Sequence, residues 1–281
     1  MPEKGHRRDK DTPSSYNTIR RFHPAPRVLV PPVPSFRSRF YPVLSLLLLL
    51  ALWQTASNLM DSSVLPGPAV VLATLVNEVG SGRLPHHLGI TLFRLVIGFT
   101  LAMTLGSVIG TVLGQRDHLN RFFDSWLVLF LNVPALVTII LCYVWFGLNE
   151  GAAIAAVVLN KLPNVIVTLR EGARSLDRDL LELAESYRFG RLKTLRHVIA
   201  PQLYPFLLAA ARNGLALIWK IILVVELLGR SDGMGYQLHL FFQMFDVAAI
   251  LAYTIAFVAV IQLIEWLFLR PLDRLAQSWR R

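Results

Sequence analysis

Charged side chains inside long apolar stretches are the residues best placed to do chemistry in this sequence. Lys161 lies near the middle of one such stretch, between Asn160 and Asn164. Another stretch carries a polar row: Arg212, Asn213, Trp219, Lys220 and Glu226. At about 100° per residue, this row occupies one side of a helix. An ionised group in the middle of a bilayer costs about 2.5 kcal/mol or more, so it usually faces protein or a wet cavity. Lys161, Arg212, Trp219, Lys220 and Glu226 are therefore our candidates for residues that line a solute pathway.

The cations in these stretches allow two interpretations. Arg212 and Lys220 could attract an anionic solute, or they could pair internally, for example Lys220 with Glu226 of a neighbouring helix. Arg94 lies near the end of an apolar stretch, where we expect it to snorkel towards water. His86 and His87 fall in a predicted loop, where we expect solvation rather than metal binding. The single cysteine, Cys142, provides neither a disulfide nor a thiol-rich metal site.

Composition points to the bilayer as the solvent of this chain. Its 281 residues are 54% hydrophobic and only 16% charged, which is too apolar for a soluble domain of this length. The net charge of +10 could suggest a nucleic-acid partner. We expect none, because the basic residues gather at the ends and in two loops instead of along one groove-reading surface.

Six apolar stretches are long enough to cross about 30 Å of hydrocarbon as helices, and no alternating strand pattern is present. The predicted spans are Tyr41–Leu59, Ile90–Leu113, Phe123–Leu148, Ala152–Leu169, Leu203–Leu228 and Asp246–Leu269. The expected fold class is thus an all-α integral membrane protein. Asn132 and Pro134 predict a kink in the third span, which is as often a packing feature as a gate.

Basic residues predict the orientation. Nine Lys or Arg lie in residues 1–39 and seven between Arg170 and Arg196, whereas the loops of the other side hold almost none. The positive-inside rule then places both termini in the cytoplasm. We expect a Pro-rich, disordered tail over 1–39, a membrane domain over 40–270 and a basic tail over 271–281.

Two segments on the outer side are expected to be structured. Pro68 begins an amphipathic helix, with apolar residues at helical spacing from Val71 to Val79. The last outer loop, Gly229–Phe245, is rich in glycine and aromatic residues. It could contact an extracytoplasmic partner or pack as a re-entrant or interfacial segment.

The segment Arg170–Tyr204 is too long and too patterned for a simple connector. Ser175 or Asp177 could begin a short amphipathic helix, because Leu180, Leu183, Ala184 and Tyr187 fall on one face. Phe189-Gly190 predicts a break, and a second amphipathic stretch follows that should end before Pro201. The expected result is a helix, a turn and a helix on the cytoplasmic side.

This segment resembles the loop that precedes the penultimate span in permease subunits of bacterial ABC importers. Their pattern is Glu-Ala-Ala, three residues, Gly, nine residues, Ile, one residue, Leu-Pro. Counting back from Pro201 puts Val198 at the Ile, Arg188 at the Gly and Glu182-Leu183-Ala184 at the Glu-Ala-Ala, without gaps. Leu183, Arg188, Val198 and Ala200 depart from the pattern, and Gly190 does not restore its spacing.

The chain from about Tyr41 onward also resembles the nitrate, sulfonate, taurine and bicarbonate branch of these permeases. The shared segments are Leu65-Pro66-Gly67-Pro68, Val144-Trp145-Phe146-Gly147, Ser175 to Ala184, Trp219-Lys220, Glu226-Leu227-Leu228-Gly229 and Gly233-Met234-Gly235-Tyr236. The resemblance implies a type I importer permease fold with about six spans in the bacterial inner membrane. It also implies a second permease copy, two ABC ATPase subunits that bind ATP and Mg, and an extracytoplasmic solute-binding protein.

The resemblance further implies that the segment 171–202 docks the ATPase. The residues it assigns to docking are Leu180, Glu182, Leu183, Ala184, Tyr187, Arg188, Gly190 and Pro201. An apolar helix face suits a groove in the ATPase, and Glu182 and Arg188 could set the register by charge. The alternative is a helix that lies on lipid headgroups, but its acidic residues oppose anionic lipid.

Other classes of function are weighed against this one. An ion-gradient-driven carrier would carry inverted repeats in one chain, and none is evident between the first and last three spans. A membrane-embedded enzyme would need a catalytic set such as His-Glu-x-x-His or Gly-x-Ser-x-Gly, and neither occurs. The sequence also lacks a phosphate-binding Gly-x-x-x-x-Gly-Lys-Ser/Thr loop, so ATP hydrolysis is expected on a separate subunit.

Overall fold

The computed structural model describes residues 40–60 and 64–269, and every regular element in these ranges is helical. The expected tails, 1–39 and 271–281, lie outside the described residues. The chain divides into two units between Leu49 and Leu50. In the first unit, the structure describes residues 40–49, which form the beginning of α1. The helices are α1 (Phe40–Leu59), α2 (Pro68–Gly80), α3 (Arg83–Gln115), α4 (Asp117–Asn132), α5 (Ala135–Phe146), α6 (Glu150–Arg174), α7 (Arg178–Ser186), α8 (Arg191–Thr194), α9 (Ala200–Gly229), α10 (Met234–Gln243) and α11 (Val247–Ile264).

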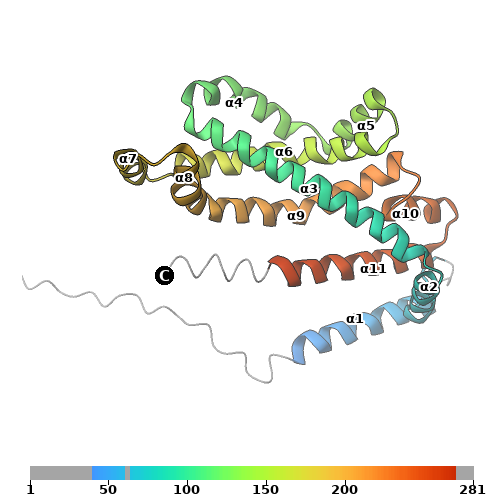
Figure 1. The fold of residues 1–281 in the computed structure, drawn as a ribbon. Coiled ribbons are helices and arrows are strands. Elements are labelled where there is room, and N and C mark those ends of the chain that lie inside the picture. The colour runs from blue at the N-terminus through green and yellow to red at the C-terminus, as the bar shows by residue number, and fades with distance from the viewer. Residues whose placement is uncertain (1–39, 61–63, 270–281) are drawn as a thin grey trace, which may run out of the picture. The chain divides into compact units, whose positions relative to one another are not determined.

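Helices α3, α6 and α9 lie side by side in the second unit and contact one another (Figure 1). The close approach of α3 to α6 follows from a stripe of small residues at every fourth position of α3: Gly98, Ala102, Gly106, Gly110 and Gly114. A Cβ atom at Gly110 would lie 2.6 Å from the backbone oxygen of Ile166. Small residues at this spacing let membrane helices pack backbone to backbone, since lipid supplies no hydrophobic force between them.

Within the described residues, four helices are long and apolar enough to cross a membrane: Arg83–Gln115, Glu150–Arg174, Arg191–Gly229 and Val247–Leu267. Val43–Leu59 is a shorter apolar helix, and α4 with α5 would supply a fifth span only if counted together. The predicted third span is kinked where Asn132 and Pro134 predict it, because α4 and α5 are bent by 98° at Val133-Pro134. Pro134 lacks an N–H and disfavours a helical residue before it, which explains the position of the break.

The predicted helix after Leu65-Pro66-Gly67 is present as α2, with Pro68 at its first turn. Its side chains Val71 and Glu78 are buried, and α2 packs against α11. The next helix begins at Arg83, seven residues before the predicted Ile90. His86 and His87 therefore lie on a helix and not in a loop. The first turns of α3 are polar, so a search for apolar residues places the start of this helix too late.

The expected end of the second amphipathic stretch before Pro201 is also wrong. Residues 195–199 form a wider, π-type turn, and the helix continues through Pro201 into α9. The whole segment Arg191–Gly229 is one helical run of 39 residues. A π-type turn absorbs the missing N–H of a proline without ending the helix.

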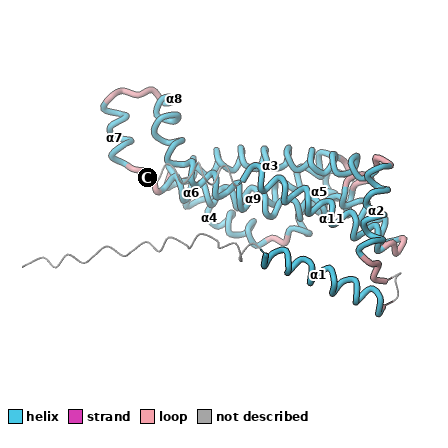
Figure 2. The backbone as a smooth tube through the Cα atoms, turned by 90° about the horizontal axis from the view of Figure 1, so that it is seen from below, coloured by secondary structure: helices cyan, strands magenta, loops and turns pink. Residues whose placement is uncertain are grey.

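The two ends of this bundle carry different structures. Helices α7 and α8 lie at one end of α6 and α9, and α2, α5 and α10 lie at the opposite end (Figures 1 and 2). We call these the loop end and the far end. In the last predicted outer loop, α10 packs against α9 and α11 with Met234 and Phe241 buried.

Candidate functional site

At the loop end, the segment Arg178–Ile199 forms a helix, a turn and a second helix. Asp177 caps α7, since its Oδ1 accepts the backbone N–H of Asp179 at 2.9 Å. The N–H of Phe189 donates to the oxygen of Ala184 at 2.8 Å, and the N–H of Arg188 donates to the oxygen of Glu185 at 2.8 Å. These two bonds define a Schellman motif, in which the residue after the helix cap takes a left-handed conformation.

Arg188 occupies that left-handed position, with φ of 51°. It is the residue that stands where the importer pattern has Gly, which explains why the pattern prefers Gly there. Gly190 instead forms the N-cap of α8 in an extended conformation. The turn of this chain is therefore a Schellman turn with a strained non-glycine residue, Arg188, at its left-handed position.

Helix α7 has an inward and an outward face. Ala184 is buried and Leu181 packs against the core near Leu203. Glu182 is exposed, and Leu180, Leu183 and Tyr187 expose 44%, 52% and 72% of their surface. Ala184 is therefore covered by its own chain, whereas the other apolar side chains of the predicted face are free to meet a partner. Pro201 lies beyond the turn, in the first turn of α9.

Polar residues line two cavities along α9. A cavity of about 400 Å³ between α6 and α9 is lined by Lys161, Asn164, Val165, Thr168, Ala210, Asn213, Ala216 and Leu217. A cavity of about 390 Å³ between α9 and α11 is lined by Arg212, Asn213, Leu215, Ala216, Trp219, Val258, Ile261, Gln262 and Glu265. We call them the Lys161 cavity and the Arg212 cavity. Asn213 and Ala216 belong to both, so the two cavities are neighbours.

The residues of the predicted polar row on α9 lie in different surroundings. Arg212, Asn213 and Trp219 line cavities, and the Trp219 ring meets Phe257 edge to face at 5.7 Å. Lys220 is exposed, with its Nζ 5.3 Å from the centre of the Trp219 ring. Glu226 does not join them, because it is fully buried and bound to Arg94. Pairing of Lys220 with Glu226 within this chain is therefore not observed.

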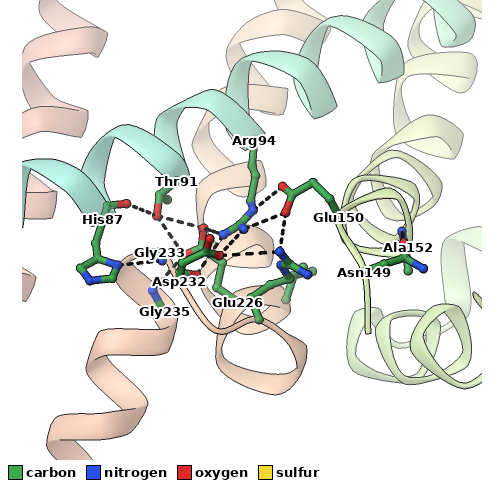
Figure 3. A network of polar contacts seen from close by, with 12 residues as sticks. His87, Thr91, Arg94, Asn149, Glu150, Ala152, Glu226, Asp232, Gly233 and Gly235 are labelled. Carbon is green, nitrogen blue, oxygen red and sulfur yellow. Dashed lines mark hydrogen bonds and ion pairs between the residues drawn. The ribbon is translucent and has the colours of Figure 1, made fainter. Parts of the chain in front are cut away.

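Arg94 is the centre of a buried ion network at the far end (Figure 3). Its guanidinium is 2% exposed, so the expectation that it snorkels to water is wrong. Nη1 donates to Glu226 at 2.8 Å and to the backbone oxygen of Asp232 at 3.0 Å. Nε and Nη2 donate to Glu150 at 2.6 and 2.9 Å, and Nη2 also donates to Asp232. All five donors of the guanidinium are thereby used.

Glu226 is held by further contacts that fold the following loop back over it. The N–H of Gly235 donates to its Oε2 at 2.9 Å, and Thr91 Oγ1 lies 2.9 Å from each carboxylate oxygen (Figure 3). Gly233, with φ of 102°, lies so close to this carboxylate that a side chain would overlap it. The network thus ties α3, α6 and α9 to the loop that precedes α10.

His87 takes part in the same loop contacts, so the expectation that it is solvated is wrong. Its Nδ1 accepts the N–H of Gly233 at 3.1 Å, and its Nε2 lies 2.8 Å from Nε2 of Gln237. Arg230 adds a second guanidinium, 2.8 Å from Glu150. Burial alone would raise the pKa of Asp232, but the hydrogen bond from Arg94 and the charges of Arg94 and Arg230 lower it below its usual range.

Long apolar helices with polar cavities between them define a multi-pass membrane protein. Residues 102–280 match the family of binding-protein-dependent transport system inner membrane components. The chain belongs to this family. Because such permeases are transport components, the chain itself is not an enzyme.

Individual relatives agree with this assignment. The aliphatic sulfonates transport permease SsuC of Bacillus subtilis is 31% identical, over 83% of this chain and 84% of that protein. The taurine transport system permease TauC of Escherichia coli is 28% identical, over 84% of this chain and 88% of that protein. A crystal structure of an amino acid ABC transporter with histidines superposes with a TM-score of 0.56 at 19% identity, over 73% of this chain and 97% of that chain. This likeness shows the fold.

Proposed function

We propose that the chain is one of two permease copies in an ATP-driven importer of the bacterial inner membrane. The importer carries a small anionic solute, such as a sulfonate, taurine, nitrate or bicarbonate, which a binding protein delivers at the far end. Separate ATPase subunits, with ATP and Mg, bind at the loop end. Family membership and the names of the relatives support this proposal.

The observation that carries the proposal is the outward face of α7. Leu183 is half exposed on a helix that projects from the loop end, and Glu182 lies next to it. The opposite side of α7 is already packed against the chain through Leu181 and Ala184. An apolar side chain flanked by a charge on a projecting helix suits insertion into a groove of a partner protein.

Co-purification tests this docking directly. The permease is expressed with an ATPase subunit of a sulfonate importer from the same organism, as wild type, Leu183→Glu and Glu182→Lys. We expect both variants to lose most of the bound ATPase, because one puts a charge into an apolar groove and the other reverses the charge that sets the register.

Glu185→Lys is the matched control, since Glu185 is also exposed on α7 but lies on its flank. This variant should keep the ATPase. Gel filtration of each permease verifies that it is folded. If Leu183→Glu and Glu182→Lys retained the ATPase as the wild type does, the docking assignment would be wrong.

The energy source needs a separate experiment. Proteoliposomes that contain the complete transporter, with ATP enclosed and the binding protein outside, are assayed for uptake of ethanesulfonate, and for uptake with an ion gradient in the absence of ATP. We expect uptake only with ATP and the ATPase subunits. Uptake driven by an ion gradient through this chain alone would instead establish a secondary transporter.

A further inference from the structure

The Lys161 cavity contains a buried cation for which the described residues provide no counter-ion. Lys161 is 2% exposed. It takes part in no ion pair or hydrogen bond with any residue in 40–60 or 64–269, and its side chain lines the cavity. A buried charge without a partner is costly, and it is retained where a ligand completes the pair.

The surroundings of Lys161 are built to hold its side chain at this cavity. Gly214 on α9 leaves the room, because a Cβ there would lie 3.1 Å from Cε of Lys161 and 3.2 Å from the ring of Phe99. Lys161 itself comes from the middle of α6, four residues after Val157, which packs against Gly98 of α3. The ammonium is therefore positioned by close packing of three helices.

The other polar groups of the cavity favour an anion. Asn164 and Asn213 offer carboxamide N–H donors, and neither side chain is hydrogen-bonded within the described residues. The Thr168 hydroxyl already donates to the oxygen of Asn164 at 2.9 Å. The lining contains no carboxylate. One ammonium and two amides match the several acceptor oxygens of a small oxyanion.

The neighbouring Arg212 cavity differs in these respects. Its lining includes the carboxylate of Glu265 together with the guanidinium of Arg212. Arg212 already takes part in a polar or electrostatic interaction. A bound anion would meet repulsion from Glu265 there, so the Lys161 cavity is the better anion site of the two.

We propose that the Lys161 cavity is the subsite that binds the anionic group of the transported solute, with Lys161 as its cation and Asn164 and Asn213 as hydrogen-bond donors. The ligand class is a small sulfonate or a comparable oxyanion. This inference rests on the proposed transport of an anion. It adds the residues that recognise the charge.

Binding without transport gives the first test. The purified permease is melted in detergent at constant ionic strength with increasing ethanesulfonate, or with the neutral dimethyl sulfone. We expect ethanesulfonate to raise the melting temperature of the wild type in a concentration-dependent way. The sulfone should have no effect. In Lys161→Met, which keeps an unbranched side chain one atom shorter and removes its charge, the rise should disappear.

Arg121→Met is the matched control. Arg121 is an exposed cation of α4 outside both cavities, so its loss should leave the rise unchanged. If Lys161→Met fails to fold, Asn213→Leu provides a second variant at an exposed residue and should weaken ethanesulfonate binding at least five-fold. An equal rise in the wild type and Lys161→Met, or no rise in the wild type, would overturn the proposal.

Uptake by the complete transporter gives the second test and separates the two proposals. We expect Lys161→Met to reduce ATP-driven ethanesulfonate uptake more than ten-fold, with the ATPase still bound. Normal uptake by this variant would refute the subsite even if transport depended on ATP. If uptake by the wild type did not depend on ATP, the importer proposal would be refuted. The melting experiment would still test whether the Lys161 cavity binds the anion.

Discussion

The Nη1 atom of Arg94 on α3 lies 2.8 Å from Oε1 of Glu226 on α9, and both side chains are buried. The pair joins helices that are far apart in the sequence, and Glu150 and Asp232 share the same guanidinium. Two cations, Arg94 and Arg230, thereby face three carboxylates in one network. Its members depend on one another, because each buried charge is stabilised by the others.

Removal of Arg94 should therefore strongly destabilise the protein. Arg94→Ala leaves the carboxylate of Glu226 buried without its cation, which costs about 3 to 5 kcal/mol. We expect a marked fall in the melting temperature in detergent, measured by tryptophan fluorescence. The double variant Arg94→Ala with Glu226→Gln should recover part of this loss, since the stranded charge is then removed.

A surface pair supplies the control for Arg94. Arg174 and Glu171 form an ion pair at 3.2 Å in which both side chains are 40% or more exposed. Arg174→Ala should cost at most about 1 kcal/mol. Equal effects of Arg94→Ala and Arg174→Ala would contradict a stabilising role of the buried network.

Substitution of glycine by alanine in α3 should change the stability of the protein in different directions at two positions. Gly110→Ala should destabilise the protein, because the new methyl group would lie 2.6 Å from the backbone oxygen of Ile166. Gly89→Ala on the same helix should be neutral or stabilising by up to about 1 kcal/mol, since nothing lies within 4 Å of a Cβ there. Thermal unfolding of the two variants side by side tests the packing of α3 on α6.

Replacement of Arg188 by glycine should increase the stability of the protein. A non-glycine residue in the left-handed region is strained by about 1 kcal/mol or more, so Arg188→Gly should stabilise the turn after α7. Hydrogen exchange of the amides of residues 184–189 should slow about five-fold. Arg178→Gly, at the first residue of α7, is the control and should speed exchange in that helix. Unchanged exchange in Arg188→Gly would show that the turn carries no strain.

Acid should weaken the far-end loop through Asp232. Its pKa is lowered in the folded protein, so the ionised form contributes stability that is present above the unfolded pKa of about 4. That contribution is lost as the pH falls below about 4 and through the folded pKa. The melting temperature of Asp232→Asn should be lower than that of the wild type at pH 7, and the difference should shrink towards pH 3. A difference that is constant with pH would exclude this linkage.

Much of the fold follows from the sequence, because length and apolarity alone predict membrane helices. The helix, turn and helix at Arg178–Ile199 is confirmed, as is the helix that begins at Pro68. The glycine stripe of α3 could also have been recognised, since its four-residue spacing is visible in the sequence. These features are local and need no knowledge of neighbouring helices.

The parts that escaped prediction depend on contacts between distant residues. Nothing near Arg94 in the sequence reveals that Glu150, Glu226 and Asp232 converge on it, so snorkelling was the natural expectation. The kink at Pro134 is predicted and the continuation through Pro201 is not, although both prolines lack the same backbone N–H. At Pro134 two helices meet at 98°, whereas at Pro201 a π-type turn lets the helix continue. Packing decides between these outcomes, and composition does not.

The unbroken run Arg191–Gly229 has a mechanical consequence. At 1.5 Å per residue its 39 residues extend about 58 Å. It begins at the turn held by Arg188, forms a wall of both cavities and ends beside the carboxylate of Glu226. The π-type turn at residues 195–199 and Pro205 are points at which this run can bend. The same helix nevertheless connects the turn at Arg188 with the cavity beside Lys161 and with the Arg94 network, so a displacement of the turn has a continuous helical path to both.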